Sequence, residues 1–338
     1  KIDDGIYPFY VRSQTVERIN SWTFDGEAIL TAGDGVGVGK VFHHTYGKIG
    51  VHQRVYILSN FKCDANYLFH FFSSHFYNRV KRMSAKNSVD SVRKEMITEM
   101  PLYLPSKQEQ AKIGVLLSLL DERIATQSKV IEDLKKLKSA IINYAINSLD
   151  TDFAKFSSLY EMAGEGGTPT TSNASFYDNG KIPFIKIDDL KQKYLTENKD
   201  FITELGLQKS SAWLVPTHSI LFSNGATIGE ISITTYPVCT KQGILGIVPK
   251  QNIDVEFLYY FMSSSYFKKA VSRIVTEGTM KTAYLKDINN IRCPIPTKEK
   301  QQEIAKMPSA LNSKIDFEQS ILKLFCSQKQ YLLRQMFI

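Results

Sequence analysis

The sequence lacks any apolar run long enough to span a membrane. Its first residues, KIDDGIYPFY, have neither the basic start nor the apolar stretch of a targeting peptide. The four cysteines, Cys63, Cys239, Cys293 and Cys326, are scattered without CxxC spacing or a nearby histidine ligand set. This pattern predicts reduced, mostly packed thiols rather than disulfides or a zinc site. We therefore expect a cytoplasmic protein with no membrane partner.

The sequence also lacks the common catalytic motifs. It contains no Asn-Pro-Pro-Tyr or Asp-Pro-Pro-Tyr segment to hold a flipped adenine, no Walker motif, and no carboxylate cluster with lysine for metal-dependent cleavage. AILTAGDGVGVGKVF resembles a phosphate loop, but Asp34 stands where the first glycine should be and Val41 follows Lys40. The next residues read as a β-hairpin around Tyr46 and Gly47, whereas a nucleotide loop needs a helix there. The chain is predicted to bind and position without catalysing, with no cofactor or metal of its own.

What the sequence does contain is an internal duplication. PSKQEQAKIG begins at Pro105 and PTKEKQQEIA begins at Pro296, an offset of 191 residues (296 minus 105). Upstream, DANYLFHFFSS begins at Asp64 and DVEFLYYFMSS at Asp254, an offset of 190. A period this long indicates a duplicated globular module followed by a helix, so the partner that the protein contacts should be duplicated as well.

Each module should begin with β structure and end with a helix. Short stretches rich in branched and aromatic residues predict strands; they are Tyr7 to Val11, Ala28 to Thr31, Val51 to Leu58, Ile182 to Ile187, Ser219 to Ser223 and Gly243 to Val248. Asp64 and Asp254 are the predicted N-caps of the helices that follow. Gly35 and Gly39 correspond to Gly225 and Gly229, which indicates a turn needed in both modules.

A long helix follows each module. Ser106 and Glu109 have capping-box spacing before the first helix. Apolar residues then recur at heptad spacing; the predicted seam is Leu120, Ile124, Ile131, Leu134 and Ile141 in the first helix and Leu311, Ile315, Leu322, Phe325 and Leu332 in the second, with Gln127, Lys138, Glu318 and Lys329 as its polar members. The stripe is too long for one small module to cover, so the two helices should pack antiparallel as a rod with a module at each end. Pro308 predicts an irregular start or a kink in the second helix.

Two variable modules, each ending in a Pro-x-x-x-x-Gln-x-x-Ile helix entrance, resemble the specificity subunit (HsdS) of type I restriction-modification systems. The resemblance implies an α+β chain with target recognition domains at 1–105 and 148–296, and spacer helices at 106–147 and 297–338. About 35 residues precede Pro183 in the second module and only 7 precede Pro8 in the first, so the first domain is expected to be N-terminally incomplete.

The resemblance also implies partners. The family reads a bipartite double-stranded DNA target in the major groove and docks two modification (HsdM) subunits, which bind S-adenosylmethionine and methylate adenine. Restriction (HsdR) subunits, which use ATP and Mg²⁺, can join the complex. Two alternatives remain open at this point: a stand-alone S-adenosylmethionine-dependent DNA methyltransferase that uses the loop from Gly33 to Gly39, and a non-catalytic coiled-coil adaptor. Binding of S-adenosylmethionine by the lone chain would support the methyltransferase. A salt-dependent DNA-binding titration of the assembled complex would distinguish the adaptor, which should bind no DNA.

Basic and amide side chains in expected loops are the DNA-binding candidates, because Arg and Lys bind phosphate or guanine and Gln reads adenine. Those in the first module are Arg12, Gln14, Lys40, His43, Gln53, Arg54, Arg79, Arg82 and Lys86, and those in the second are Lys186, Asn224, Lys241, Gln242, Arg273, Lys281 and Thr282. The formal charge of +8 (42 minus 34) permits a polyanion partner but does not require one. Each candidate has a competing interpretation as a solvated or structural residue, and for His43 and His44 that interpretation is favoured. The aromatic residues Phe69, Phe71, Tyr259 and Phe261 are expected in the core.

Overall fold

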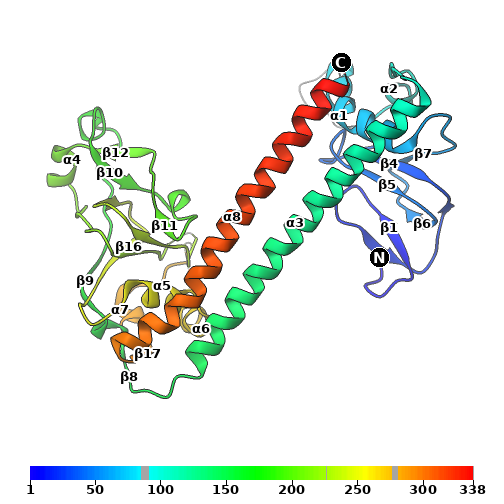
Figure 1. Cartoon of the computed structure of the whole chain (residues 1–338). Coiled ribbons are helices and arrows are strands. Elements are labelled where there is room, and N and C mark those ends of the chain that lie inside the picture. Colours follow the sequence, from blue (N-terminus) through cyan, green and yellow to red (C-terminus); the bar gives the residue numbers. More distant parts are fainter. Residues whose placement is uncertain (85–90, 226, 276–280, 338) are drawn as a thin grey trace. The chain divides into compact units, whose positions relative to one another are not determined.

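The computed structural model describes residues 1–84, 91–225, 227–275 and 281–337. It divides into two compact units: unit 1 comprises Lys1–Val130 with Glu318–Ile338, and unit 2 comprises Ile131–Phe317. Each unit therefore combines one globular module with parts of both long helices (Figure 1). The boundaries between the units fall inside both long helices, after Val130 and after Phe317. The division of the chain into two modules and two helices therefore stays a prediction.

Unit 1 contains two small sheets with strand orders β2-β1-β6-β3 and β5-β4-β7. The strands are β1 (Tyr7–Tyr10), β2 (Glu17–Ile19), β3 (Phe24–Asp25), β4 (Ala28–Ala32), β5 (Phe42–Thr45), β6 (Lys48–Val51) and β7 (Val55–Leu58). Strand β1 is antiparallel to β2 and parallel to β6, whereas β4 is antiparallel to both of its neighbours. All five residues of β4 are buried, which places this strand at the centre of its sheet.

The predicted hairpin around Tyr46 and Gly47 is wrong. The chain does turn there, with Gly47 at φ +79°, but the two flanking strands join different sheets. Gly47 exchanges backbone hydrogen bonds with Gly26 (3.0 and 3.3 Å), and this contact directs β6 onto β3 while β5 stays on β4. The turn therefore connects the two sheets, and local residue preference could not distinguish this from a hairpin.

The helices of unit 1 pack against the β4 sheet. Helix α1 (Ala65–Met83) begins at Asp64, whose carboxylate accepts the Tyr67 N–H at 2.8 Å, as predicted for its N-cap. A short helix α2 (Lys94–Thr98) follows. Buried Phe72, Phe76 and Val80 of α1 form one core with Ile29 of β4, so the helical face chosen by the sequence pattern is the face that packs.

Unit 2 repeats this arrangement with additions. Its strands are β8 (Phe153–Lys155), β9 (Tyr160–Glu165), β10 (Ile182–Ile185), β11 (Tyr194–Leu195), β12 (Asp200–Ile202), β13 (Ile220–Ser223), β14 (Ile231–Thr234), β15 (Cys239–Thr240), β16 (Ile244–Pro249) and β17 (Arg292–Pro294). Its short helices are η1 (Phe156–Ser158), η2 (Ala174–Phe176), η3 (Ile187–Asp189), α4 (Glu204–Gln208), α5 (Val255–Ser263), α6 (Ser265–Ile274) and α7 (Leu285–Ile288).

The strand pairings of the two units correspond. Strand β10 is antiparallel to β12 and parallel to β15, as β1 is to β2 and β6. Strand β13 lies between β14 and β16, as β4 lies between β5 and β7. Strand β9 adds to the outer side of β16, and β11 pairs in parallel with β14. The duplication seen in the sequence is therefore a duplication of topology.

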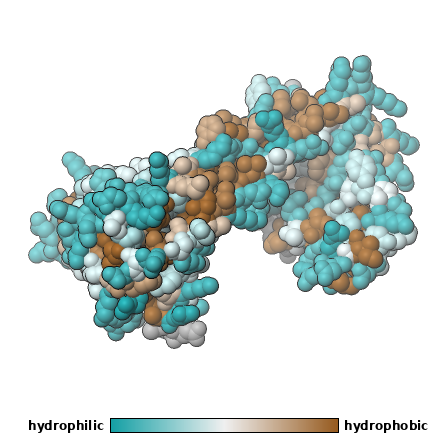
Figure 2. Space-filling view, turned by 60° about the horizontal axis from the view of Figure 1, so that its bottom comes forward, coloured by the Kyte–Doolittle hydropathy of each residue, from teal (hydrophilic) through white to brown (hydrophobic). Residues whose placement is uncertain are grey.

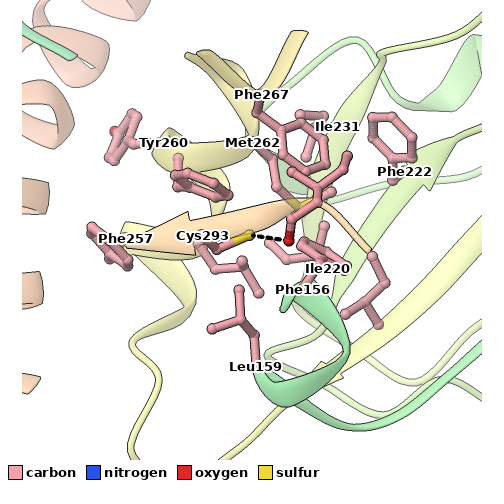
Figure 3. Close-up of a cluster of buried hydrophobic side chains, with 14 of the residues drawn as sticks. Phe156, Leu159, Ile220, Phe222, Ile231, Phe257, Tyr260, Met262, Phe267 and Cys293 are labelled. Atoms are coloured by element: carbon pink, nitrogen blue, oxygen red, sulfur yellow. Dashed lines mark hydrogen bonds between the residues drawn. The ribbon is translucent and has the colours of Figure 1, made fainter. Parts of the chain in front are cut away.

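The largest core lies in unit 2, where α5 and α6 cover one face of the β13 sheet (Figure 3). The ring of Phe267 lies 5.5 to 6.0 Å, between centroids, from the rings of Phe156, Phe222 and Phe261. Cys293 is buried in this cluster, where burial raises the pKa of its thiol. All four cysteines are free, as predicted, although Cys326 is exposed; the expected core aromatics Phe69, Phe71, Tyr259 and Phe261 do pack in hydrophobic clusters.

The two long helices are α3 (Lys107–Asn147) and α8 (Lys298–Met336). The predicted capping box is present, since the Ser106 N–H donates to the Glu109 carboxylate (3.0 Å) and the Glu109 N–H donates to the Ser106 hydroxyl (3.3 Å). The irregular start predicted from Pro308 is wrong. Helix α8 begins at Lys298, the position equivalent to Lys107, and continues through Pro308. The kink given as the alternative stays a prediction, because proline both removes a backbone donor and crowds the carbonyl of the preceding turn.

The helices pack antiparallel, and all ten predicted seam residues are buried or half-buried. In unit 1, the Gln127 amide donates to the Glu318 backbone carbonyl (3.2 Å) and to its carboxylate, and Lys329 pairs with Asp121. In unit 2, Lys138 donates to Asn312 (2.8 Å). Each polar member of the seam therefore bonds to a side chain of the other helix, and Gln127 and Glu318 bond to each other, which fixes the register of the helices.

A buried histidine joins this seam to the module in unit 1. His70 of α1 places Nδ1 3.8 Å from the Asp121 carboxylate and Nε2 3.4 Å from the Ser118 hydroxyl. Burial lowers the pKa of His70 to about 4, with the charges of Lys329 and His44 acting in the same direction and Asp121 opposing them. His70 is therefore neutral at physiological pH.

The glutamine of the repeated helix entrance is a structural clamp. Gln110 is only 4% exposed, and its Oε1 accepts the backbone N–H of Asp64 (3.1 Å) while its Nε2 donates to the Pro105 carbonyl (2.7 Å). One side chain thus joins the start of α3 to the N-cap of α1. The Pro-x-x-x-x-Gln spacing provides this geometry because the proline carbonyl lies just before the first helical turn.

Unit 2 repeats the clamp with the same atoms. Gln301 is 1% exposed, accepts the Asp254 N–H (2.8 Å) and donates to the Pro296 carbonyl (2.9 Å). Both copies therefore tie a long helix to the N-cap of the module helix that packs on it. Buried backbone groups at these positions would otherwise lack partners.

Candidate nucleic-acid interface

Three chain connections meet at one edge of the β structure in unit 1. Strands β1 and β6 run parallel, so they end together, and the His52 N–H donates to the Tyr10 carbonyl (2.9 Å). Strand β4 ends beside the start of β7, where the Gly33 N–H donates to the Arg54 carbonyl (2.8 Å). The loops after β1, after β4 and between β6 and β7 therefore form one surface, the loop edge of unit 1.

Unit 2 has the equivalent loop edge. The Lys241 N–H donates to the Ile185 carbonyl (2.9 Å), which joins the loops after β10 and β15. The Asn224 N–H donates to the Gly243 carbonyl (3.0 Å), which adds the loop after β13. The same three connections are therefore gathered in both copies.

Two arginines and an aspartate form the charged centre of the loop edge in unit 1. Arg12 donates to Asp34 Oδ1 (2.8 Å), and Arg54 Nη1 lies 3.6 Å from Oδ2 of the same carboxylate. The hydrogen bond from Arg12 and the nearby positive charges hold the pKa of Asp34 below its usual value. Asp34 therefore stays ionised and orients both guanidinium groups, while the trio keeps a net charge of +1.

The glycines after β4 and β13 are required by the backbone. Gly35 and Gly39 have φ of +77° and +65°, and Gly229 has φ of +108°, all in the region that disfavours side chains. Gly225 is different, because a Cβ there would lie 3.2 Å from the Gly243 Cα. The predicted glycine turn is confirmed in both copies, although Gly225 serves a close approach rather than a left-handed turn.

The glycine turns lead into strands. Residues after Gly39 enter β5, and residues after Gly229 enter β14. Phosphate loops and dinucleotide loops present the first turn of a helix to their ligand, and that helix is missing from the described part of both loops. The loop from Gly33 to Gly39 therefore does not have the geometry of a nucleotide-binding site.

Exposed predicted residues lie on both loop edges. Gln53 occupies the turn between β6 and β7, and Gln242 occupies the corresponding turn between β15 and β16. Lys241 lies beside Gln242, and Lys186 follows β10 and pairs with Asp200 at 2.8 Å. The structure therefore gathers amide and basic side chains at equivalent places in the two units.

Gln14, Lys40 and His43 flank the loop edge of unit 1. The Gln14 amide donates to the Phe42 carbonyl (3.4 Å), and His43 Nε2 lies 3.2 Å from the Ser13 carbonyl. Burial lowers the pKa of His43, so a neutral imidazole is favoured. Lys40 lies over the Tyr77 ring, 5.1 Å from its centroid, and stays exposed. Of these three residues, Lys40 is the one with a charge to offer a phosphate.

Two of the predicted DNA-binding residues form hydrogen bonds within unit 1 or unit 2. Asn224 is 1% exposed and its amide donates to the Ala283 carbonyl (3.2 Å), so it holds the glycine turn instead of facing solvent. Arg79 donates to the carbonyls of Met96 (2.7 Å) and Glu99 (2.8 Å) and so completes the C-terminal end of α2. Asn224 is therefore structural, whereas DNA contact by the half-buried Arg79 stays a prediction.

The remaining candidates lie beyond the strand loops. Arg82 and Arg273 are exposed in the last turns of α1 and α6, at equivalent places. Lys281 is exposed and Thr282 is half-exposed. The next residue is Ala283, whose N–H donates to the Asn224 carbonyl (2.9 Å). Lys86 lies outside the described residues.

Sequence reasoning missed one loop of unit 2. The Gly166 N–H donates to the Ile244 carbonyl (2.9 Å), and Thr168 Oγ1 accepts the Gln242 N–H (3.3 Å). These bonds bring the loop after β9 to the loop edge, with Thr170 and Thr171 exposed. The run GGTPTTSN could have revealed it, since consecutive glycines followed by hydroxyl residues favour a polar loop.

Among the described residues, no group of three or more His, Cys, Asp or Glu side chains is placed to hold a metal ion. None of the helices in the described part of the chain combines the length and apolar character that a membrane crossing needs.

Sequence comparison gives several relatives with a common description. The chain is 32% identical over 173 residues to the type I restriction enzyme MjaIX specificity subunit of Methanocaldococcus jannaschii, covering 49% of this chain and 39% of that subunit. It is 22% identical over 346 residues to the EcoDI specificity subunit of Escherichia coli, covering 90% of this chain and 74% of that one. The match thus spans well under half of the first relative and about three quarters of the second.

Solved structures share the fold. The S subunit of a type I restriction-modification system from M. genitalium matches with a TM-score of 0.67 and 17% identity, covering 100% of this chain and 90% of that chain. A chain from a study of complex assembly and conformational transition of the type I restriction-modification system matches with a TM-score of 0.59 and 14% identity, covering 97% and 84%.

A family model settles the relationship. The model described as the type I restriction modification DNA specificity domain matches residues 1–136 and again residues 151–324. The two matches correspond to the two copies of the repeated topology, and together they include both loop edges. The chain therefore belongs to the type I restriction modification DNA specificity domain family.

Proposed function

We propose that the chain is the DNA-specificity subunit of a type I restriction-modification complex, reads a bipartite double-stranded target, and has no catalytic activity of its own. One observation carries this proposal: the two units present equivalent loop edges built from the same three connections. A duplicated binding surface on one chain matches a target made of two half-sequences.

The loop edges have the chemistry for this role. Arg12, Arg54, Lys186 and Lys241 are exposed cations that can bind phosphate or the major-groove acceptors of guanine. The glutamines of the two turns can read adenine through paired donor and acceptor atoms. Since the two copies differ in their basic residues, each should read its own half-sequence in the major groove.

The long helices offer surfaces for partner subunits. Large apolar side chains lie exposed on them: Val115, Leu116 and Leu119 in the unit 1 part of α3, Leu324 and Tyr331 in the unit 1 part of α8, and Leu137, Tyr144, Met307 and Phe317 in unit 2. Figure 2 shows apolar surface along the helical part of the chain. Exposed apolar patches of this kind mark interaction sites.

We assign these surfaces to two modification (HsdM) subunits, which would supply S-adenosylmethionine and the adenine-methylating site. Restriction (HsdR) subunits, with ATP and Mg²⁺, would join the assembled complex. The chain itself would be cytoplasmic, where its DNA target and these partners meet.

A domain exchange tests the proposal. Residues 151 to 295 are replaced by the same region of a relative with another target, and methylated adenines are mapped by sequencing DNA incubated with the complex and S-adenosylmethionine. One half of the target should change while the other half stays. The original chain with the same modification subunits is the matched control.

Three results would contradict the proposal. A change in both halves, or in neither, would show that the loop edges do not read independently. Methyl transfer by the isolated chain would favour the stand-alone methyltransferase, and an assembled complex that binds no DNA at low salt would favour the adaptor.

A further inference from the structure

A lysine is buried where the β structure of unit 2 meets α8. The Lys193 side chain is 3% exposed, although lysine is seldom buried without a partner. In the sequence, Lys193 lies seven positions after Lys186 of the loop edge. Its backbone carbonyl accepts the Ile233 N–H (2.7 Å), which ties this position to β14.

The ammonium group of Lys193 is fully engaged. It forms an ion pair with Glu256 of α5, and it donates to the Tyr260 hydroxyl (2.9 Å) and to the Ser309 hydroxyl of α8 (3.1 Å). The Glu256 carboxylate also accepts from Ser309 (2.8 Å) and from Tyr194. Glu256, Tyr260 and Ser309 together use the three N–H donors of the ammonium, so they hold it in one place.

Aromatic rings complete its surroundings. Lys193 Nζ lies 4.7 Å from the ring centroids of Tyr194 and Tyr260 and 5.8 Å from that of Tyr259. Burial raises the pKa of all three hydroxyls, so these rings stay neutral. The rings exclude water from the ammonium while their faces attract the charge.

The residues of unit 1 that match Glu256, Tyr260 and Ser309 carry no charge, and the nearby Asp121 pairs with Lys329 of α8. The repeat matches Glu256 with Asn66, Tyr260 with His70, and Ser309 with Ser118. There the Ser118 hydroxyl donates to the Asn66 amide oxygen (3.2 Å) and faces His70 at 3.4 Å. A serine of the long helix thus meets the module in both units.

Stability alone does not require the ion pair found in unit 2. A buried ion pair gives little net stability, because removing two charges from water costs about as much as their attraction returns. Its directional contacts instead select one arrangement of the packed elements.

We infer that Lys193 is a positioning residue that fixes the second recognition module on α8 and thereby restricts the number of unspecified base pairs accepted between the two half-sequences. This inference rests on the proposed function. Lys193 would act through the module and would not itself contact DNA, since it is buried.

The test compares methylation by the full complex on a DNA library in which spacer length varies and both half-sequences are kept. The main variant combines Lys193→Met with Glu256→Leu, which replaces the ion pair by apolar side chains and leaves Tyr260 and Ser309 bonded to each other. Lys193→Met alone is the second variant. Lys191→Met is the matched control. It makes the same substitution two residues earlier in the chain, where the lysine side chain is exposed.

The double variant should unfold within about 3 °C of the original chain, as expected for replacement of a buried pair by apolar groups. Its preference for the original spacer over spacers one base pair longer or shorter should fall about tenfold. The half-sequences should be unchanged, and Lys191→Met should behave as the original chain does.

Unchanged spacer preference in the double variant would overturn the inference. If that variant unfolds early, Lys193→Met decides: broader spacer acceptance at a temperature where the variant is folded supports positioning, and the original preference refutes it. Failure of the proposed function would look different, because the original complex would then show no defined half-sequences at all.

Discussion

Lengthening the two long helices together should change the spacing of the recognised half-sequences. Four residues are inserted in α3 between Ser128 and Lys129, and four in α8 between Phe317 and Glu318. These places lie at the same level of the helix pair, because Gln127 bonds to Glu318 across the seam. Both helices then gain the same length at the same level, which keeps the seam contacts on either side of the insertions.

The expected shift follows from helix geometry. Four residues add about 6 Å at 1.5 Å per residue, which is close to two base pairs at about 3.4 Å each. They make slightly more than one turn, so the apolar stripe rotates by only about 40°. A seven-residue version adds about 10.5 Å, close to three base pairs, with a rotation of about 20°.

The assay maps methylated adenines on a library of spacer lengths. The four-residue variant should accept the original half-sequences with one or two more unspecified base pairs between them, and the seven-residue variant with about three more. A control chain carries the same added residues after the end of α8, where they leave both helices unchanged. An active variant that keeps the original spacing would refute the idea that the helices measure the spacer.

Three further predictions concern single side chains. Gln110→Leu should lower the free energy of unfolding by about 2 to 4 kcal/mol, because two buried backbone groups lose their partner; the same change at exposed Gln108 should have little effect in denaturant unfolding. Arg54→Ala should weaken DNA binding by the complex and make its dependence on log salt shallower by about 0.9 if the guanidinium meets a phosphate, whereas Lys62→Ala, beyond the opposite end of β7, should leave the slope unchanged. Because burial lowers the pKa of His70 to about 4, the unfolded state binds the extra proton first, so His70 should remove about 3 kcal/mol of stability as pH falls from about 6.5 to 4. His70→Gln should abolish that part of the pH dependence, and an unaltered profile would contradict it.

Local sequence patterns determined the repeated elements. The N-caps Asp64 and Asp254, the capping box at Ser106, and the heptad seam each depend on residues close together in the chain, and all are present in the structure. The glycine turns belong to the same class, because Gly39 and Gly229 adopt backbone angles that other residues avoid.

The duplication extended this local information to topology. Equal offsets between distant segments predicted equivalent modules and antiparallel helices without any knowledge of strand pairing. Residue type misled at Asn224, which was expected in a loop open to DNA but is buried against Ala283, whereas the matching Asp34 of the first copy is half-buried. Matching positions share a backbone path, while the burial of each side chain depends on what packs there.

Only the tertiary structure decided which distant residues meet. The separation of β5 and β6 into two sheets depends on Gly47 pairing with Gly26, which no property of the intervening turn announces. The role of Gln110 depends on a backbone N–H 46 residues away, and that of Lys193 on side chains from α5 and α8. A periodic pattern records which face of an element is buried, but the partner of a buried polar atom is fixed by long-range packing. The sequence by itself therefore determined the helices, the turns and the repeat. The tertiary structure decided the glutamine clamp, the loop edges and the contacts of the buried lysine.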